Sequence, residues 1–313
     1  MPPSLLLLSA HAPAYARELR AADLPGLSVL ATTDPAEARA RGQDCGLALG
    51  EPNLLRQVIQ HLPALRWVQA TWAGVEPLLD PALRRDYTLT NARGVFGEAM
   101  TEYVLAYLLA HERRVFERHA AQQAARWDNT PTGALRGKRL GLLGVGSIGS
   151  HIAQALKPFG LTLYGYTQSS ESCPAIDRYF HDSERLAFAS ALDYLVSILP
   201  NTAATRHVVD AALLKALPVG AVFINVGRGS AVETDALVSA LISGHLARAV
   251  LDVFEQEPLP PEHIFWRTPN LHLTAHTAAP STPAAITAVF ADNYGRWTRG
   301  EPLRHVVDFE RGY

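Results

Sequence analysis

The sequence predicts an α/β protein built on parallel β-sheets, and two observations support this prediction. Short apolar runs recur along all 313 residues with helical or loop segments between them, a pattern typical of parallel βαβ units. One of these runs is followed directly by a glycine-rich turn and then by a helical pattern, over residues 140–151. A chain of this length forms one or two domains with large cores.

The composition excludes several classes of protein. Hydrophobic residues make up 48% of the chain and charged residues 19%, as in ordinary folded proteins. The net charge of −2 gives no reason to expect nucleic acid or an anionic membrane as a partner. Cys45 and Cys173 are too few for a disulfide framework and lack metal-binding spacing, so they fit a reducing, cytoplasmic compartment. The Leu5–Leu8 run lacks a preceding basic region, which predicts a first buried strand rather than a signal peptide, and no apolar run is long enough to span a membrane.

The first part of the chain is predicted to be a parallel α/β unit without a glycine fingerprint of its own. A helix is expected from Leu54 to His61, where Pro63 ends it. The apolar runs expected to form its strands are residues 4–8, 27–31, 45–49, 67–71 and 87–90.

A long helical stretch follows, from Ala99 to about Ala125. It contains no proline or glycine, and its apolar residues keep helical spacing. It is longer than an average helix, so two interpretations stay open. It is either a core helix or a helix that joins two domains and also packs against a partner subunit.

Residues 140–151 organise the rest of the chain. The apolar run at their start suits a strand buried on both faces of a parallel sheet. Gly144, Gly146 and Gly149 then have the G-x-G-x-x-G spacing of a dinucleotide-binding turn. The first glycine allows the tight turn, the second admits the pyrophosphate and the third lets the helix pack closely. We therefore expect the following helix to receive the phosphates at its N-terminus.

The next predicted strand, Leu161–Tyr166, ends where an acidic residue would bind the ribose of NAD. The sequence there continues Thr167, Gln168, Ser169 and Ser170. It holds no carboxylate to repel the 2′-phosphate of NADP, and no arginine or lysine to attract it. We predict NADP as the preferred cofactor and keep NAD as the alternative. A loop that binds the ribose weakly and discriminates poorly between the two cofactors is the other interpretation.

Four further strands are predicted, and each is followed by residues unlike its apolar body. Ligands of open parallel sheets bind beyond the carboxyl ends of the strands, so these residues are candidates for a site. The strands are expected at residues 194–199, 221–226, 249–253 and 271–274. The candidates are Pro200–Thr202, Gly227–Gly229, Asp252, Glu257 and His276.

In order and spacing, these segments resemble the D-isomer-specific 2-hydroxyacid dehydrogenase family, and within it most closely the glyoxylate/hydroxypyruvate reductases. Several motifs together are far more specific than any one, and they extend over most of the chain. The segments that carry the resemblance are Leu143–Gly149, Leu199–Thr202, Asn225–Gly229, Leu251–Pro260, Leu273–His276, Asn293–Tyr294 and Gly300–Leu303.

The resemblance implies two Rossmann-like parallel-sheet domains with the active site in the cleft. A discontinuous, flavodoxin-like substrate-binding domain would comprise residues 1–96 and 280–313. A classical dinucleotide-binding domain would comprise residues 97–279. The resemblance also implies a homodimer, and nothing in it calls for a metal ion.

The same resemblance implies that Arg228, Glu257 and His276 catalyse the reversible reduction of a small 2-oxo acid to the D-2-hydroxy acid. A planar, always-charged guanidinium suits the substrate carboxylate and carbonyl. An imidazolium donates the proton to the carbonyl oxygen, and a neighbouring carboxylate favours its charged form. The nicotinamide supplies the hydride.

Binding residues are implied in the same way. Those implied for the cofactor are Gly144, Gly146, Ser147, Ile148, Gly149, Thr167, Gln168, Ser169, Leu199, Pro200, Thr205, Val226 and Asp252. Those implied for the substrate are Trp72, Ala73, Gly74 and Val75, together with Arg228 and His276.

Several alternatives stay open. Relatives commonly carry proline before the catalytic histidine, whereas this chain has Ala275, and without a fixed φ we expect a looser approach of His276. Trp72 is either a packing residue or a side chain that narrows the substrate pocket. Since fold does not determine function, a nicotinamide-binding regulatory or scaffold protein is the alternative to an enzyme. The complete Arg228, Glu257 and His276 set favours an enzyme, and the pattern around Glu257 favours 2-oxo acids over formate or phosphite.

Overall fold

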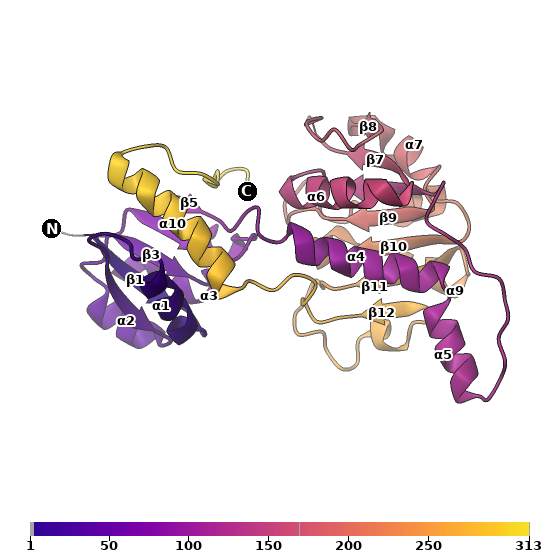
Figure 1. Cartoon of the computed structure of the whole chain (residues 1–313), viewed down its shortest axis with the longest axis horizontal. Helices are drawn as coiled ribbons and strands as arrows, with labels where there is room; N and C mark the ends of the chain where they lie inside the picture. The colour runs from indigo at the N-terminus through magenta and orange to yellow at the C-terminus, as the bar shows by residue number, and fades with distance from the viewer. Residues whose placement is uncertain (1–2, 169, 313) are drawn as a thin grey trace. The chain divides into compact units, whose positions relative to one another are not determined.

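The computed structural model describes residues 3–168 and 170–312, and it divides the chain into two compact α/β units (Figure 1). One unit consists of Met1–Val95 and Ser281–Tyr313, and the other is the continuous stretch Phe96–Pro280. These bounds lie within one residue of those expected from the sequence. Ser169, which we expected at the ribose of the cofactor, lies outside the described residues.

The discontinuous unit contains a parallel five-stranded sheet in the order β2-β1-β3-β4-β5. The side chains of Leu5–Leu8 have no exposed surface, so this run is a buried strand as predicted. The strands are β1 (Ser4–Leu8), β2 (Ser28–Thr32), β3 (Leu47–Gly50), β4 (Trp67–Ala70) and β5 (Thr88–Thr90). The helices are α1 (Ala12–Ala21), α2 (Pro35–Arg41), α3 (Pro52–Leu55) and α10 (Pro283–Arg299).

Trp67 joins the C-terminal helix α10 to this unit. Its ring lies 5.1 Å from that of Phe290 and 5.8 Å from that of Trp297, measured between centroids. Its indole Nε1–H donates to Thr90 Oγ1 at 2.8 Å. Large aromatic side chains bury much apolar surface, and their stacking adds to that stabilisation. The end of the chain therefore returns to the unit in which the chain begins.

The helix expected over residues 54–61 is not continuous. α3 ends at Leu55, and a separate 3₁₀ turn spans Ile59–His61. Between them the chain forms i→i+3 hydrogen bonds, such as Val58 N–H to the Leu55 carbonyl at 3.0 Å. This tighter winding buries Leu55, Val58 and Ile59 together, so packing overrides the helical pattern.

The continuous unit contains a parallel seven-stranded sheet in the order β12-β11-β10-β9-β6-β7-β8. The chain runs outward from β6 to β8 on one side and from β9 to β12 on the other, so the order reverses between β6 and β9. Ligands of such sheets bind beyond the strand ends at this point. The strands are β6 (Arg139–Leu143), β7 (Thr162–Tyr166), β8 (Arg178–Phe180), β9 (Tyr194–Ser197), β10 (Ala221–Asn225), β11 (Leu246–Leu251) and β12 (Leu271–Leu273).

The short edge strand β8 was not predicted, because Arg178–Phe180 does not belong to an apolar run. The helices that cover this sheet include α6 (Ser147–Leu156), α7 (Arg185–Ala189), α8 (Ala211–Ala216) and α9 (Thr234–Ile242). Among the described residues, no helix combines the length and the apolar character that crossing a membrane requires.

The long helical stretch is two helices, so the prediction of a single helix is wrong. α4 (Gly97–Glu112) packs along α6, and α5 (Val115–Gln123) follows after Arg114, whose φ of 55° is left-handed (Figure 1). The break places Phe116 and Glu117 against Arg248 of β11, which is 4% exposed. A buried guanidinium needs such partners, and this tertiary demand ends the helix.

Candidate active site

The three glycines of the turn after β6 differ in their backbone conformation and in the space around them. Gly144 has a φ of +98°, a conformation that other residues rarely adopt. A Cβ on Gly149 would lie 2.4 Å from the Gly144 carbonyl oxygen, so this glycine allows close packing of α6 on the turn. A Cβ on Gly146 would meet no atom within 4 Å, so the second glycine borders open space.

The N-terminus of α6 has unused backbone donors. Gly146 occupies the cap position, and no side chain caps the helix. Within the described residues, the N–H groups of Ser147, Ile148 and Gly149 find no acceptor, and Ser150 donates to the Gly146 carbonyl at 2.9 Å. Unsatisfied N–H groups at the positive end of a helix dipole suit a pyrophosphate. The turn and helix therefore fit the dinucleotide that the fold implies.

A histidine that the sequence analysis did not single out holds the loop after β7. His181 follows β8, with its Nδ1 2.9 Å from the Thr167 carbonyl oxygen and its Nε2 2.7 Å from Glu171 Oε1. An acidic side chain therefore does lie at this loop, slightly beyond the position where we looked for one. The hydrogen bond to Glu171 raises the pKa of His181, which favours a positive ring beside Thr167.

The turns after β9 and β10 approach each other closely. A Cβ on Gly227 would lie 2.5 Å from the Leu199 backbone nitrogen. The Thr205 hydroxyl donates to the Pro200 carbonyl at 2.6 Å and so closes the turn after β9. Val226 is buried directly after β10. These residues lie along one edge of the sheet, and their contact with the cofactor stays a prediction.

Asn225 shapes the turn that presents Arg228. Its wholly buried side chain donates to the Arg228 carbonyl oxygen at 2.9 Å and accepts the Gly227 N–H at 3.2 Å. The Arg228 guanidinium in turn donates to the Gly227 carbonyl at 2.7 Å. Asn225 thus satisfies the backbone of a turn that no regular hydrogen-bonding pattern holds.

The three predicted catalytic residues come together at the carboxyl edge of the sheet. A Cβ on Gly229 would lie 1.9 Å from the Phe254 carbonyl carbon, so the Arg228 turn touches the loop that carries Glu257. The Phe254 N–H donates to Glu257 Oε1 at 2.8 Å. His276 Nδ1 lies 2.8 Å from Glu257 Oε2.

The charges of this group shift the pKa values of its members. The hydrogen bond to Glu257 raises the pKa of His276, although partial burial and the charge of Arg228 oppose it. Burial alone would raise the pKa of Glu257, but the hydrogen bonds from His276 and from the Phe254 N–H outweigh it and lower that pKa. Both shifts favour an imidazolium–carboxylate pair. The His276 side chain keeps 54% of its surface exposed, so a substrate can reach it.

Asp252 anchors the loop that carries His276. It is 2% exposed, and its carboxylate accepts the Thr277 N–H at 2.8 Å and the Ala278 N–H at 3.0 Å. Its backbone carbonyl accepts the His276 N–H at 2.7 Å. The side chain therefore holds its own chain, and its contact with the nicotinamide stays a prediction.

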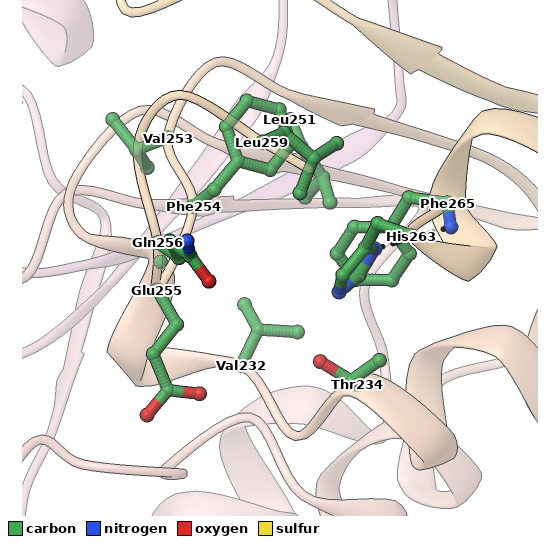
Figure 2. A pocket seen from close by; sticks show the side chains of 11 residues that line it. Val232, Thr234, Leu251, Val253, Phe254, Glu255, Gln256, Leu259, His263 and Phe265 are labelled. Atoms are coloured by element: carbon green, nitrogen blue, oxygen red, sulfur yellow. Dashed lines mark hydrogen bonds between the residues drawn. The ribbon is translucent and has the colours of Figure 1, made fainter. Parts of the chain in front are cut away.

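A separate cavity of about 250 Å³ is lined in part by Val253–Gln256 and Leu259 of the loop after β11 (Figure 2). Its lining is largely apolar, and none of the three predicted catalytic residues borders it. The lining residues are Gly229, Val232, Thr234, Leu251, Val253, Phe254, Glu255, Gln256, Leu259, His263 and Phe265. Phe254 belongs both to this lining and to the hydrogen bond with Glu257, so the cavity adjoins the candidate active site without being part of it.

The predicted substrate residues Trp72–Val75 belong to the discontinuous unit, where they follow β4. Val75 is buried in the core of that unit, whereas Trp72 is exposed, which argues against a packing role for the tryptophan. Asn91 Nδ2 donates to the Ala73 carbonyl at 2.7 Å. In the described part of the chain, the four N–H groups of this segment donate to no acceptor. Successive unused N–H groups suit an anion such as a carboxylate.

A glycine turn at the reversal point of a parallel sheet, next to an arginine and a histidine–glutamate pair, defines a nicotinamide-dependent oxidoreductase. Residues 105–278 match the family model described as "D-isomer specific 2-hydroxyacid dehydrogenase, NAD binding domain". The chain belongs to this family of NAD(P)-dependent dehydrogenases, so the predicted family, fold class and enzyme class are confirmed.

Individual relatives agree with this assignment. The chain is 33% identical to glyoxylate/hydroxypyruvate reductase A of Klebsiella pneumoniae over 257 residues, which cover 80% of this chain and 82% of that protein. It is similar to a crystal structure of a D-isomer specific 2-hydroxyacid dehydrogenase family protein from Aeromonas salmonicida, with a TM-score of 0.93, 38% identity and 99% and 100% of the two chains covered. An NADPH-dependent glyoxylate/hydroxypyruvate reductase from Sinorhizobium meliloti, solved with NADP and sulfate, has a TM-score of 0.87, 30% identity and the same coverage.

Proposed function

We propose that this enzyme uses NADPH to reduce a small 2-oxo acid, of the size of glyoxylate or hydroxypyruvate, reversibly to the D-2-hydroxy acid. The hydrogen-bonded pair of Glu257 and His276 beside Arg228 is the observation that supports this most strongly. Reduction of a carbonyl needs a proton donor and a fixed positive charge where negative charge develops. The names of the Klebsiella and Sinorhizobium relatives support the substrate class.

His276 is proposed to carry the proton. Its Nδ1 is engaged with Glu257, so Nε2 is the atom that faces the substrate and gives its proton to the carbonyl oxygen. The nicotinamide, when bound, supplies the hydride to the carbonyl carbon. In the reverse direction, neutral His276 accepts the proton of the hydroxy acid.

Two groups are proposed to hold the substrate carboxylate. Arg228 offers a planar, permanently charged fork that matches a carboxylate and also polarises the adjacent carbonyl. The unused N–H groups of Trp72–Val75 would complete the binding of this anion. Because Trp72 is exposed, we propose that its side chain narrows the pocket and favours short acids.

The cofactor preference is proposed to be NADP over NAD. Neither Thr167 nor Gln168 carries a carboxylate, and Glu171, further along the same loop, is engaged by His181. A protonated His181 would add positive charge at this loop. The Sinorhizobium relative was solved with NADP, which agrees with this preference.

We also propose that the enzyme is a homodimer in the cytoplasm. Leu109, Val115 and Trp127 expose apolar surface on α4, on α5 and in the loop that follows, with Trp127 92% exposed. Exposed apolar surface of this kind marks interaction sites, and a second copy of the chain would cover it. The two free, buried cysteines suit a reducing compartment. Sedimentation of the purified chain as a monomer would contradict the dimer.

The decisive experiment follows the absorbance of NADPH and NADH with purified enzyme and a panel of 2-oxo acids, glyoxylate and hydroxypyruvate included. We expect fast turnover with NADPH and a short acid, and slower turnover with NADH. Binding of NADPH without turnover on any acid would replace this proposal with a regulatory role on the same fold.

A further inference from the structure

The loop that carries His276 is held in a conformation that it would not adopt by itself. His276 has a φ of 55°, in the left-handed region, which residues with a side chain rarely adopt. Such a conformation persists only where the surroundings determine it. The residue before it is Ala275, which leaves the local backbone without the constraint of a proline.

A series of side-chain hydrogen bonds constrains the backbone of this loop. Thr274 Oγ1 donates to Asp252 Oδ1 at 2.5 Å, and the Tyr103 hydroxyl oxygen lies 2.7 Å from Thr274 Oγ1. The Thr274 hydroxyl has a single proton, and that proton is donated to Asp252. Tyr103 is therefore the donor to Thr274. The order of donation is Tyr103 to Thr274 to Asp252, and Asp252 in turn accepts backbone N–H groups of the loop.

Tyr103 is well placed to fix this chain of hydrogen bonds. It lies on α4, whose Met100, Val104 and Leu108 are buried in the core of the same unit, so the helix is a rigid support. Its ring packs against that of Tyr107, with 4.9 Å between centroids. Burial raises the pKa of Tyr103, so its hydroxyl stays protonated and remains a donor.

We propose that Tyr103 and Thr274 are positioning residues for His276, which fix the loop of residues 274–278 on Asp252 in place of a proline at position 275. The inference rests on the proposed function, because it assigns the loop's geometry to proton transfer. Neither hydroxyl contacts the reacting atoms; both act through Asp252 and the backbone.

Tyr103→Phe tests the proposal, because it removes one hydroxyl and keeps the ring. We expect kcat to fall roughly fivefold, as for the loss of one net hydrogen bond, with the KM for NADPH unchanged. We expect the amide hydrogens of Thr277 and Ala278 to exchange about fivefold faster in native-state hydrogen exchange. Tyr294→Phe is the matched control, because the Tyr294 hydroxyl donates to the Pro25 carbonyl in the other unit at 2.8 Å.

A second substitution distinguishes a positioning role of Tyr103 from a role in the overall stability of the protein. Ala275→Pro, added to Tyr103→Phe, should restore most of kcat, because proline supplies the missing backbone constraint. In the described residues the Ala275 N–H donates no hydrogen bond, and φ at Ala275 is not positive, so proline disrupts neither. Thr274→Ser, which keeps the middle hydroxyl, should remain near wild type, whereas Thr274→Val should lose more than Tyr103→Phe.

Two outcomes would overturn the proposal. One is wild-type kcat together with wild-type exchange at Thr277 and Ala278 in Tyr103→Phe. The other is faster exchange that Ala275→Pro reverses while kcat stays low. A wild-type enzyme without turnover would defeat the proposed function instead, and the amide exchange would still report whether Tyr103 fixes the loop.

Discussion

At the scale of single residues, His276 and Glu257 divide the chemistry between them. One side chain carries the proton, and the other sets its orientation and its charge through the 2.8 Å hydrogen bond at Nδ1. Because the two roles differ, replacing each residue should change a different property of the enzyme.

Replacing His276 with alanine removes the proposed proton donor. We expect reduction of the 2-oxo acid to slow about 10²–10⁴-fold, the usual contribution of a positioned general acid. NADPH binding, measured by the change in its fluorescence, should be unaffected, because the glycine turn is intact. His61→Ala, at an exposed position in the other unit, is the control. Full turnover in His276→Ala would remove the acid–base assignment.

Replacing Glu257 with glutamine tests the coupling of charges. The hydrogen bond to Glu257 raises the pKa of His276, so His276 stays protonated to higher pH in the folded enzyme. Reduction uses protonated His276, so its rate falls as the pH rises through this pKa. In Glu257→Gln the pKa falls, and the decline of kcat should begin at lower pH.

The pH profile of kcat therefore measures this prediction directly. Glu255→Gln is a matched control, because Glu255 forms an ion pair with Arg206 near the surface and has no role in the proposed reaction. An unchanged profile in Glu257→Gln would mean that another group sets the protonation of His276.

At the scale of elements, the site depends on how closely the strand-end turns approach one another. The turn after β10 carries Arg228, and the loop after β11 carries Glu257. Their backbones meet at Gly229, where a Cβ would lie 1.9 Å from the Phe254 carbonyl carbon. No side chain lies between the two loops at this point. Their backbone contact therefore sets the distance between Arg228 and Glu257.

Gly229→Ala should push these loops apart. The clash is with backbone, which cannot rotate away, so we expect unfolding to become easier by about 1–3 kcal/mol, as for other overpacked sites. The reductase kcat should fall as well, because Arg228 and Glu257 move relative to each other. Gly46→Ala is the control, since its added Cβ would find its nearest neighbour at 3.8 Å. Denaturant unfolding and steady-state kinetics provide the two measurements.

At the scale of the whole molecule, all the residues proposed to bind the cofactor lie in the continuous unit, and each unit has hydrophobic cores of its own. Both apolar cores of the continuous unit consist only of residues from Phe96 to Pro280. The core of the discontinuous unit is a third, separate cluster that includes Val307 near the end of the chain. A unit with complete cores of its own has the anatomy of an independently folding domain.

We therefore predict that a fragment of residues 96–280 folds and binds NADPH but reduces no 2-oxo acid. Binding should stabilise the fragment by about 2.7 kcal/mol when NADPH is present at 100 times its Kd. Thermal unfolding followed by circular dichroism, with and without NADPH, tests this. A fragment that is unfolded, or that binds no NADPH, would show that the nucleotide site needs the rest of the chain.

Much of this organisation could be predicted from the sequence, and the exceptions share a cause. The glycine turn and the buried strands are local patterns, and each lies where it was expected in its own unit. Arg228, Glu257 and His276 follow the ends of predicted strands, and their catalytic roles stay a prediction. His181 and Tyr103 were not singled out, because their partners Glu171 and Thr274 are brought near only by folding. The break between α4 and α5 at Arg114 was not predicted either, because it depends on the tertiary contact with buried Arg248.

The sequence by itself therefore determined the fold class, the family and the chemical types present at the active site. The fold class follows from periodicity and from glycine conformation, which short stretches of chain encode. The family, and with it the residues expected at the active site, follows from the resemblance of several motifs to known relatives. Only the tertiary structure decided which groups hold one another. The engagement of Asp252 by its own loop and the hydrogen bond between Tyr103 and Thr274 depend on distances between segments separated in the chain. Packing sets those distances, and no local pattern records them.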